Sequence, residues 1–157
     1  MTAAYAWLKF LHVAAALWVA TGIFGSAVVR VQAKRANGVL ERALAVRILW
    51  RLHTLFTLPG VVLAGLLGFY LVSVGGFRFN ELWVTFASLL FLLLFLSTLF
   101  LVTPALSRQK NAAAQATTAA DGGARLAAAV GEKLPGIFSD VNALIVVILV
   151  LLMVTKP

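Results

Sequence analysis

The chain has 157 residues, of which 62% are hydrophobic and 11% are charged, and its mean hydropathy is +1.02. A soluble domain is usually less than half apolar and about one quarter charged, so this composition excludes an ordinary water-soluble fold and predicts a membrane protein. The sequence has no cysteine, which excludes disulfide bonds, iron–sulfur clusters, thiolate metal sites and a cysteine nucleophile.

Four stretches are long and apolar enough to cross a bilayer, for which about 20 mainly apolar residues are needed. They predict an all-α polytopic membrane protein with one domain, residues 1–157, built as a bundle of four transmembrane helices. We expect helices at about 5–30, 52–74, 82–106 and 136–155, with long loops at 31–51 and 107–135. Apolar residues recur with a helical period in the first loop, which indicates that the second helix starts ahead of the membrane. The first stretch is longer than the apolar part of a signal peptide, so we expect it to be retained.

The basic residues are unevenly distributed over these segments. A formal net charge of +8 is compatible with nucleic-acid binding, but basic residues between long apolar stretches usually fix membrane orientation, so we expect no nucleic-acid partner. Most of them lie in or beside the two long loops: Arg30, Lys34, Arg35, Arg42, Arg47, Arg51, Arg108, Lys110, Arg125 and Lys133. Only Lys9, Arg78 and Lys156 fall on the other side. The positive-inside rule therefore predicts cytoplasmic long loops and both termini outside.

Small residues mark one face of the second predicted helix, where Gly60, Ala64 and Gly68 repeat every four positions. Helices in a bilayer associate where small side chains let their backbones approach, so we expect this face to pair closely with the first helix. The same face suits a homodimer, or leaves room for a flat cofactor. Pro59, just ahead of it, lacks a backbone N–H and is expected to kink the helix.

Ionisable residues inside a membrane are costly, so each is a candidate for function. His12 lies near the outer end of the first helix, and Met153 is predicted at about the same depth near the end of the fourth. Imidazole and thioether form a known axial pair for heme b and also suit copper(I). Ala15 and Ala16, on the side of His12, would leave space for a ring. The alternative is an interfacial histidine that bonds a neighbouring helix or water.

The second histidine, His53, is predicted at the inner membrane surface, near Asp140. It should lie roughly 25 Å from His12 along the bilayer normal, so the two histidines cannot share one iron in a single chain. His53 and Asp140 could form an ion pair or a proton-handling pair, or simply help to pack two helix ends. We predict no catalytic residues, because phosphate-binding glycine loops, Ser-His-Asp sets and HExxH motifs are all missing.

Three segments carry a family resemblance: the opening Trp7-Leu8-Lys9-Phe10-Leu11-His12-Val13, the second-helix stretch Leu55-Phe56-Thr57-Leu58-Pro59-Gly60-Val61-Val62, and the end Leu152-Met153-Val154-Thr155-Lys156-Pro157. They resemble an uncharacterised bacterial family of predicted integral-membrane proteins, the domain of unknown function 2269 type. More distantly, the first two segments resemble the copper-resistance D domain and the membrane protoporphyrinogen oxidase of heme biosynthesis. This resemblance implies a bacterial inner-membrane protein with a four-helix core that handles copper or heme b, and it places the shared first-helix histidine on His12.

The sequence is compatible with three functions. The first is a heme-associated membrane protein or a small subunit of a membrane redox complex, with His12 as an iron ligand and Met153 or a neighbouring chain as the second. The second is a structural or assembly subunit of a larger membrane complex, without a cofactor of its own. The third is copper handling through His12, Met1 and Met153. The expected partners are the lipid bilayer, other membrane or redox-complex subunits, or a second copy of the chain.

Overall fold

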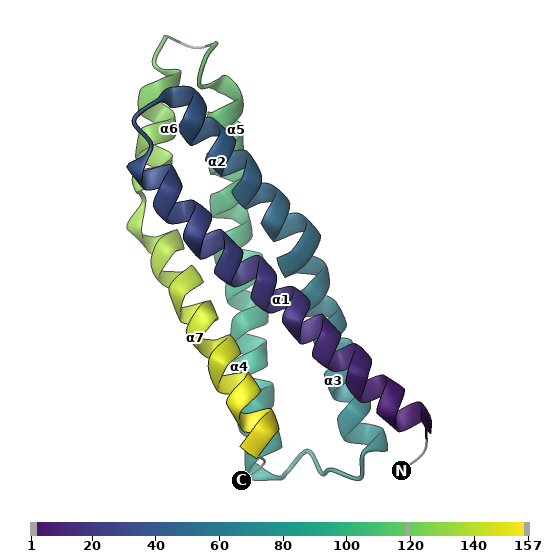
Figure 1. Ribbon diagram of the computed structural model, residues 1–157. Helices are drawn as coiled ribbons and strands as arrows, with labels where there is room; N and C mark the ends of the chain where they lie inside the picture. Colours follow the sequence, from purple (N-terminus) through teal and green to yellow (C-terminus); the bar gives the residue numbers. More distant parts are fainter. Residues whose placement is uncertain (1–2, 119, 156–157) are drawn as a thin grey trace.

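The computed structural model describes residues 3–118 and 120–155, so Met1 lies outside the described residues. These residues form helices and contain no strand. The elements are α1 (Ala3–Arg35), α2 (Val39–Leu52), the π-helical turn η1 (His53–Thr57), α3 (Leu58–Val74), α4 (Leu82–Ser97), the π-helical turn η2 (Thr98–Val102), α5 (Thr103–Gln115), α6 (Gly122–Gly131) and α7 (Lys133–Thr155) (Figure 1).

Four continuous helical segments are long and apolar enough to span a membrane: Ala3–Arg35, Val39–Val74, Leu82–Gln115 and Lys133–Thr155. In their apolar windows only 22–33% of the residues are buried within the chain. The rest are largely Leu, Val, Ile and Phe side chains that face outward, and hydrocarbon is the solvent that suits them. The predicted all-α, four-helix membrane fold is therefore confirmed.

The helices extend well beyond the predicted membrane segments at one end of the bundle. Much of the expected loops 31–51 and 107–135 is helical, because α2 begins at Val39, α5 continues to Gln115, and α6 follows. Small and aliphatic residues of α1, α2, α5 and α6 form a separate apolar cluster there, which includes the fully buried Ala33 and Leu126. Burial of these faces stabilises the early start of the second helical segment, which the periodicity of the first loop indicates, and the helices within the second expected loop.

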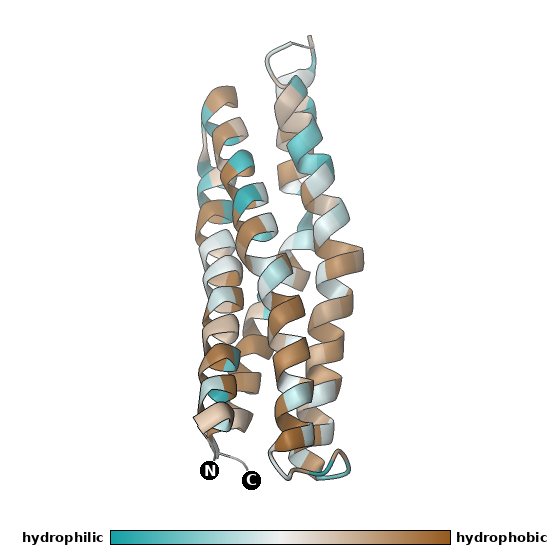
Figure 2. Cartoon of the chain, turned by 90° about the vertical axis from the view of Figure 1, so that its right-hand side faces the viewer, coloured by the Kyte–Doolittle hydropathy of each residue, from teal (hydrophilic) through white to brown (hydrophobic). Residues whose placement is uncertain are grey.

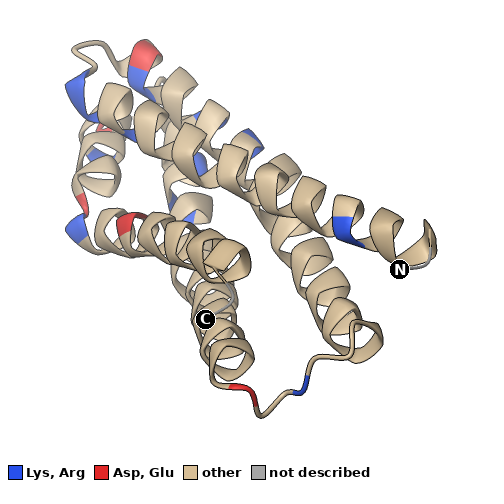
Figure 3. Ribbon diagram, turned by 60° about the horizontal axis from the view of Figure 1, so that its bottom comes forward, with Lys and Arg blue, Asp and Glu red and all other residues tan. Residues whose placement is uncertain are grey.

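The two ends of the bundle differ in character. The start of α1 and the end of α7 lie at one end, which we call the terminal end, and α2, α5 and α6 form the other, which we call the basic end (Figure 1). Hydrophilic residues are concentrated in the basic half, whereas the terminal half is mostly hydrophobic (Figure 2). Most Lys and Arg residues also lie in the basic half, with few in the terminal half (Figure 3).

Helix α1 packs most extensively on α3, through residues without bulky side chains. A Cβ atom on Gly60 would lie 3.0 Å from the backbone nitrogen of Val19, and a Cβ on Gly22 would overlap Thr57. The backbones of the two helices therefore come into direct contact, which is the usual effect of small residues in membrane helices.

Each π-helical turn precedes a proline by two positions. In η1 the Leu58 N–H bonds the carbonyl of His53, and in η2 the Thr103 N–H bonds the carbonyl of Thr98, in each case five residues back. A proline ring removes one N–H and crowds the carbonyl four residues earlier, and a widened turn relieves that crowding. The kink expected at Pro59 thus takes the form of a π-helical turn.

Pro59 has no N–H to donate to the carbonyl of Leu55, four residues earlier, and α1 supplies the donor instead. The indole Nε1 of Trp18 donates a hydrogen bond to this carbonyl at 2.8 Å. Water is excluded from the bilayer interior, so a carbonyl at this depth needs a partner from the protein.

We expect Trp18→Phe to lower the free energy of unfolding by about 1 kcal/mol, the upper part of the range measured for hydrogen bonds between membrane helices. Equilibrium unfolding in mixed micelles measures it. Trp7→Phe is the matched control, because it makes the same loss of ring size at another position of α1. There the Trp7 ring contacts the edge of Phe10 at 5.8 Å between centroids. Equal losses in both variants would mean that ring size matters and the hydrogen bond does not.

Candidate functional site

A partly open cavity of about 230 Å³ lies in the terminal half of the bundle, among α1, α3, α4 and α7. Its walls are mainly apolar, and the exceptions include Tyr5, Lys9, His12 and Ser88. Met153 of α7 also lines it. This space, which we call the terminal cavity, therefore brings together the two residues that the sequence singles out as candidate metal ligands.

The imidazole of His12 is held against α3. His12 is only 9% exposed, and a Cβ atom on Gly68 would lie 3.1 Å from its Cε1, so the glycine makes room for the ring. The ring bonds the backbone of Ala64, whereas Nδ1 has no hydrogen-bond partner among the described residues. A neutral imidazole that donates from Nε2 to a carbonyl keeps its lone pair on Nδ1. Nδ1 is thus a potential ligand atom, buried and without a partner among the described residues.

The small residues beside His12 come from another helix than predicted. Ala15 and Ala16 do not line the terminal cavity: Ala15 is part of the apolar core, and Ala16 is half-buried. Ala64, Gly65 and Gly68 of α3 line it instead. Ala15 and Ala16 are thus not placed beside the terminal cavity, which lies on the side of His12 that faces α3 and α4.

The size of the terminal cavity bears differently on the two cofactors considered. Pockets for drug-sized ligands measure about 300–1,000 Å³, and a heme macrocycle is at least as large as such ligands. The terminal cavity is smaller than that range and partly open, so a heme would need more space than the cavity encloses. A single metal ion fits easily, although no group of three or more His, Cys, Asp and Glu side chains lies together within residues 3–118 and 120–155.

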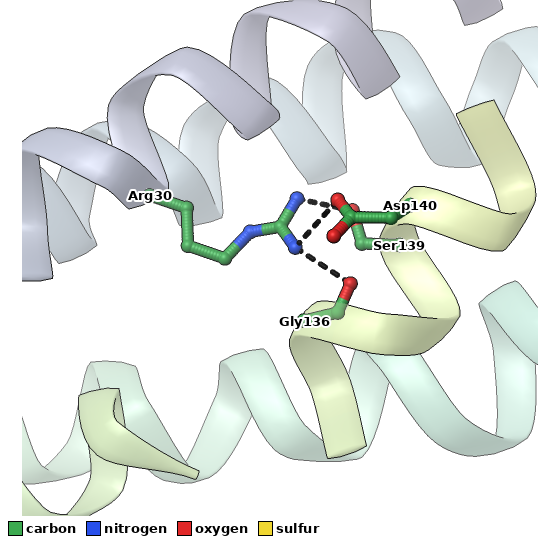
Figure 4. Close-up of polar contacts among 4 residues, drawn as sticks. All are labelled: Arg30, Gly136, Ser139 and Asp140. Atoms are coloured by element: carbon green, nitrogen blue, oxygen red, sulfur yellow. Dashed lines mark hydrogen bonds and ion pairs between the residues drawn. The ribbon is translucent and has the colours of Figure 1, made fainter. Parts of the chain in front are cut away.

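The polar pair expected between His53 and Asp140 is not formed. His53 Nε2 lies 2.8 Å from the hydroxyl oxygen of Thr103, and Asp140 instead pairs with Arg30 at 3.2 Å. The Arg30 guanidinium also donates to the Gly136 carbonyl at 2.8 Å and the Ser139 hydroxyl at 2.6 Å (Figure 4). Both predicted residues lie in the basic half, but they face different neighbours.

A buried amide that the sequence reading passed over connects α4, η2 and α7. The Ser97 hydroxyl donates to Asn142 Oδ1 at 2.6 Å, and Asn142 Nδ2 donates to the Thr98 hydroxyl oxygen at 3.3 Å. All three side chains are buried. The available signal was an asparagine within the apolar fourth stretch and a Ser-Thr pair within the leucine-rich third, since buried polar residues in a bilayer need partners.

A comparison with known families identifies the chain. The model of the family described as a predicted integral membrane protein, DUF2269, matches residues 6–157. The chain therefore belongs to this family, and it is an integral, multi-pass membrane protein. The searches of the curated proteins and of the solved structures gave no match.

Proposed function

We propose that this member of the DUF2269 family binds copper(I) in the terminal cavity, with His12 Nδ1 and the Met153 thioether as ligands. The observation that supports the proposal most is the buried Nδ1 of His12, which has no partner among the described residues and belongs to a side chain that shares a cavity with Met153. Imidazole and thioether are donors that favour soft copper(I). The described residues that line the cavity include no carboxylate, so Mg²⁺ and Ca²⁺ would lack their usual ligands.

The orientation of the protein in the membrane would decide which face of the bilayer this site lies toward. Basic residues gather toward the basic end, and the positive-inside rule favours that end for the cytoplasm (Figure 3). We therefore place the terminal cavity toward the outer face of a bacterial inner membrane. Copper(I) arriving from outside would reach His12 without crossing the apolar core of the bundle.

Anaerobic titration of the detergent-purified full chain with copper(I), in competition with a coloured chelator, tests the proposal. We expect one ion per chain, and we expect His12→Ala and Met153→Leu each to weaken binding roughly tenfold or more, since even second-shell changes cost that much at metal sites. Ser88→Ala is the matched control, because Ser88 lines the same cavity without offering a soft ligand. X-ray absorption should then report one nitrogen and one sulfur neighbour.

Two other outcomes of these experiments would each favour one of the other two functions over copper binding. A Soret band at one heme per chain that disappears in His12→Ala would mean that the cavity widens to admit heme b and that a redox role is correct. Aromatic rings in the cavity wall, among them those of Phe69, Trp83 and Phe91, limit the space for that. Absence of both copper and heme, with a stable co-purifying membrane partner, would favour a structural or assembly subunit.

A further inference from the structure

A second, smaller cavity lies in the basic half of the bundle and has a polar lining. Its volume is about 40 Å³, and its walls include His53 and Thr57 of η1, Thr98 of η2, Ser26 of α1 and Asn142 of α7. We call it the polar cavity. The two π-helical turns thus supply several of its polar side chains, as such turns often do at functional sites.

Ser26 is the unusual member of this lining. It is 9% exposed, and its hydroxyl has no hydrogen-bond partner among the described residues. A hydroxyl within a helix ordinarily bonds the carbonyl four residues earlier. Thr21, Thr54 and Thr155 do so in this chain, at 2.9 Å each. Ser26 therefore has a buried hydroxyl without the bond that its helix could provide.

The hydrogen bonds around His53 define which of its nitrogens can accept a bond. The Thr103 hydroxyl donates its one hydrogen to the Thr98 carbonyl at 2.7 Å. Its oxygen must then accept from His53 Nε2 across their 2.8 Å contact. A neutral His53 consequently has its lone pair on Nδ1. The side chains around the polar cavity thus offer a hydroxyl without a partner among the described residues and an acceptor nitrogen.

We propose that the polar cavity binds water, held by the Ser26 hydroxyl, and that this water extends the polar network of His53 toward the basic end. A water molecule donates and accepts, which matches the hydroxyl and the acceptor nitrogen, and it needs only about 10–15 Å³. A volume of about 40 Å³ holds one to a few such molecules and excludes a hydrated ion. The positive charge of Arg30, which also lines the cavity, already has Asp140 as its counter-ion.

Water would reach the polar cavity from one end of the bundle only. The apolar core, which includes Ile23, Val61 and Leu94, is a separate cluster from the apolar residues of the basic end. Arg30, Gln109 and Glu132 line the polar cavity, and they provide polar groups toward the basic end. Water therefore enters from the basic end, and it does not connect His53 with the terminal cavity.

The two histidines of the chain make a direct test possible. Nitrogen-15 histidine in protein reconstituted into lipid bilayers gives two imidazole spin systems, and the spectrum of His12→Asn assigns them. We expect magnetisation to pass from water to the His53 ring, and we expect Ser26→Val to reduce this transfer several-fold by filling the cavity with methyl groups. Ser88→Val, in the terminal cavity, is the control and should leave the His53 transfer unchanged. A wild-type His53 ring that receives no magnetisation from water would overturn the proposal, as would transfer that Ser26→Val does not alter.

A milder variant decides the question even if Ser26→Val folds poorly. In a dry cavity, Ser26→Ala would remove an unsatisfied buried hydroxyl and raise the stability of the protein. In a hydrated cavity the same change removes a bond to water, so we expect the unfolding midpoint in mixed micelles to fall. A midpoint that stays the same or rises would contradict bound water.

Discussion

Gly60→Ala is expected to lower the free energy of unfolding by about 1–3 kcal/mol, the usual cost of overpacking a close contact. The new Cβ would lie 2.9 Å from Val19 Cγ2 and 3.0 Å from the Val19 backbone nitrogen. A flexible side chain could move aside, but the backbone of α1 cannot do so without separating the two helices along their contact. Equilibrium unfolding in mixed micelles measures the loss.

Gly25→Ala is the matched control for this prediction. A Cβ atom there would approach only the Leu52 side chain, at an ordinary van der Waals distance of 3.4 Å. Alanine favours a helix over glycine, so this variant should be neutral or slightly more stable than the wild type. If Gly60→Ala behaved in the same way, the close approach of α1 and α3 would not be what stabilises the bundle.

The sequence predicts the membrane fold well because the length of an apolar stretch is visible in the sequence, and the thickness of the bilayer sets the length that a spanning helix needs. Helices at the basic end were harder to predict. Val39 to Trp50 carries two arginines and is too short to cross a membrane by itself, so its helicity depends on packing against α1, α5 and α6. Tertiary contacts of this kind leave only a weak periodicity in the sequence.

Depth in the membrane could be predicted for the candidate site, but the direction of a side chain could not. His12 and Met153 were expected at one depth, and they do line one cavity. His53 and Asp140 were also expected at one depth, yet their side chains bond Thr103 and Arg30. Residue counting gives position along a helix, whereas the facing neighbour depends on how each helix is rotated in the bundle.

The π-helical turns explain part of that failure. A helical period of 3.6 residues, carried through η1, misassigns the faces on either side of it, because a π-helical turn contains an additional residue. The same argument applies to η2, which places Thr98 beside Asn142. Pro59 and Pro104 mark both places in the sequence, but a proline signals a kink without specifying its form.

Arg30→Met should cost about 2 kcal/mol of stability, since hydrogen bonds to charged groups contribute about 1.5–3 kcal/mol when partly buried. The Arg30 side chain is 16% exposed and links α1 to the first turns of α7 through Gly136, Ser139 and Asp140 (Figure 4). Methionine keeps a similar length and apolar contact but donates no hydrogen bond. The variant therefore removes the polar link with little loss of packing.

Asp140→Asn separates the ion pair from the other contacts of Arg30. The Asp140 side chain is 72% exposed, and an exposed ion pair contributes only about 0–1 kcal/mol because water and salt screen it. We therefore expect Asp140→Asn to lower the free energy of unfolding much less than Arg30→Met does in the same assay. The difference between the two losses should change little with salt concentration. Equal losses would assign the stabilisation to the charge of Asp140, whereas the expected order assigns it to the Gly136 carbonyl and the Ser139 hydroxyl, which fix the start of α7 against α1.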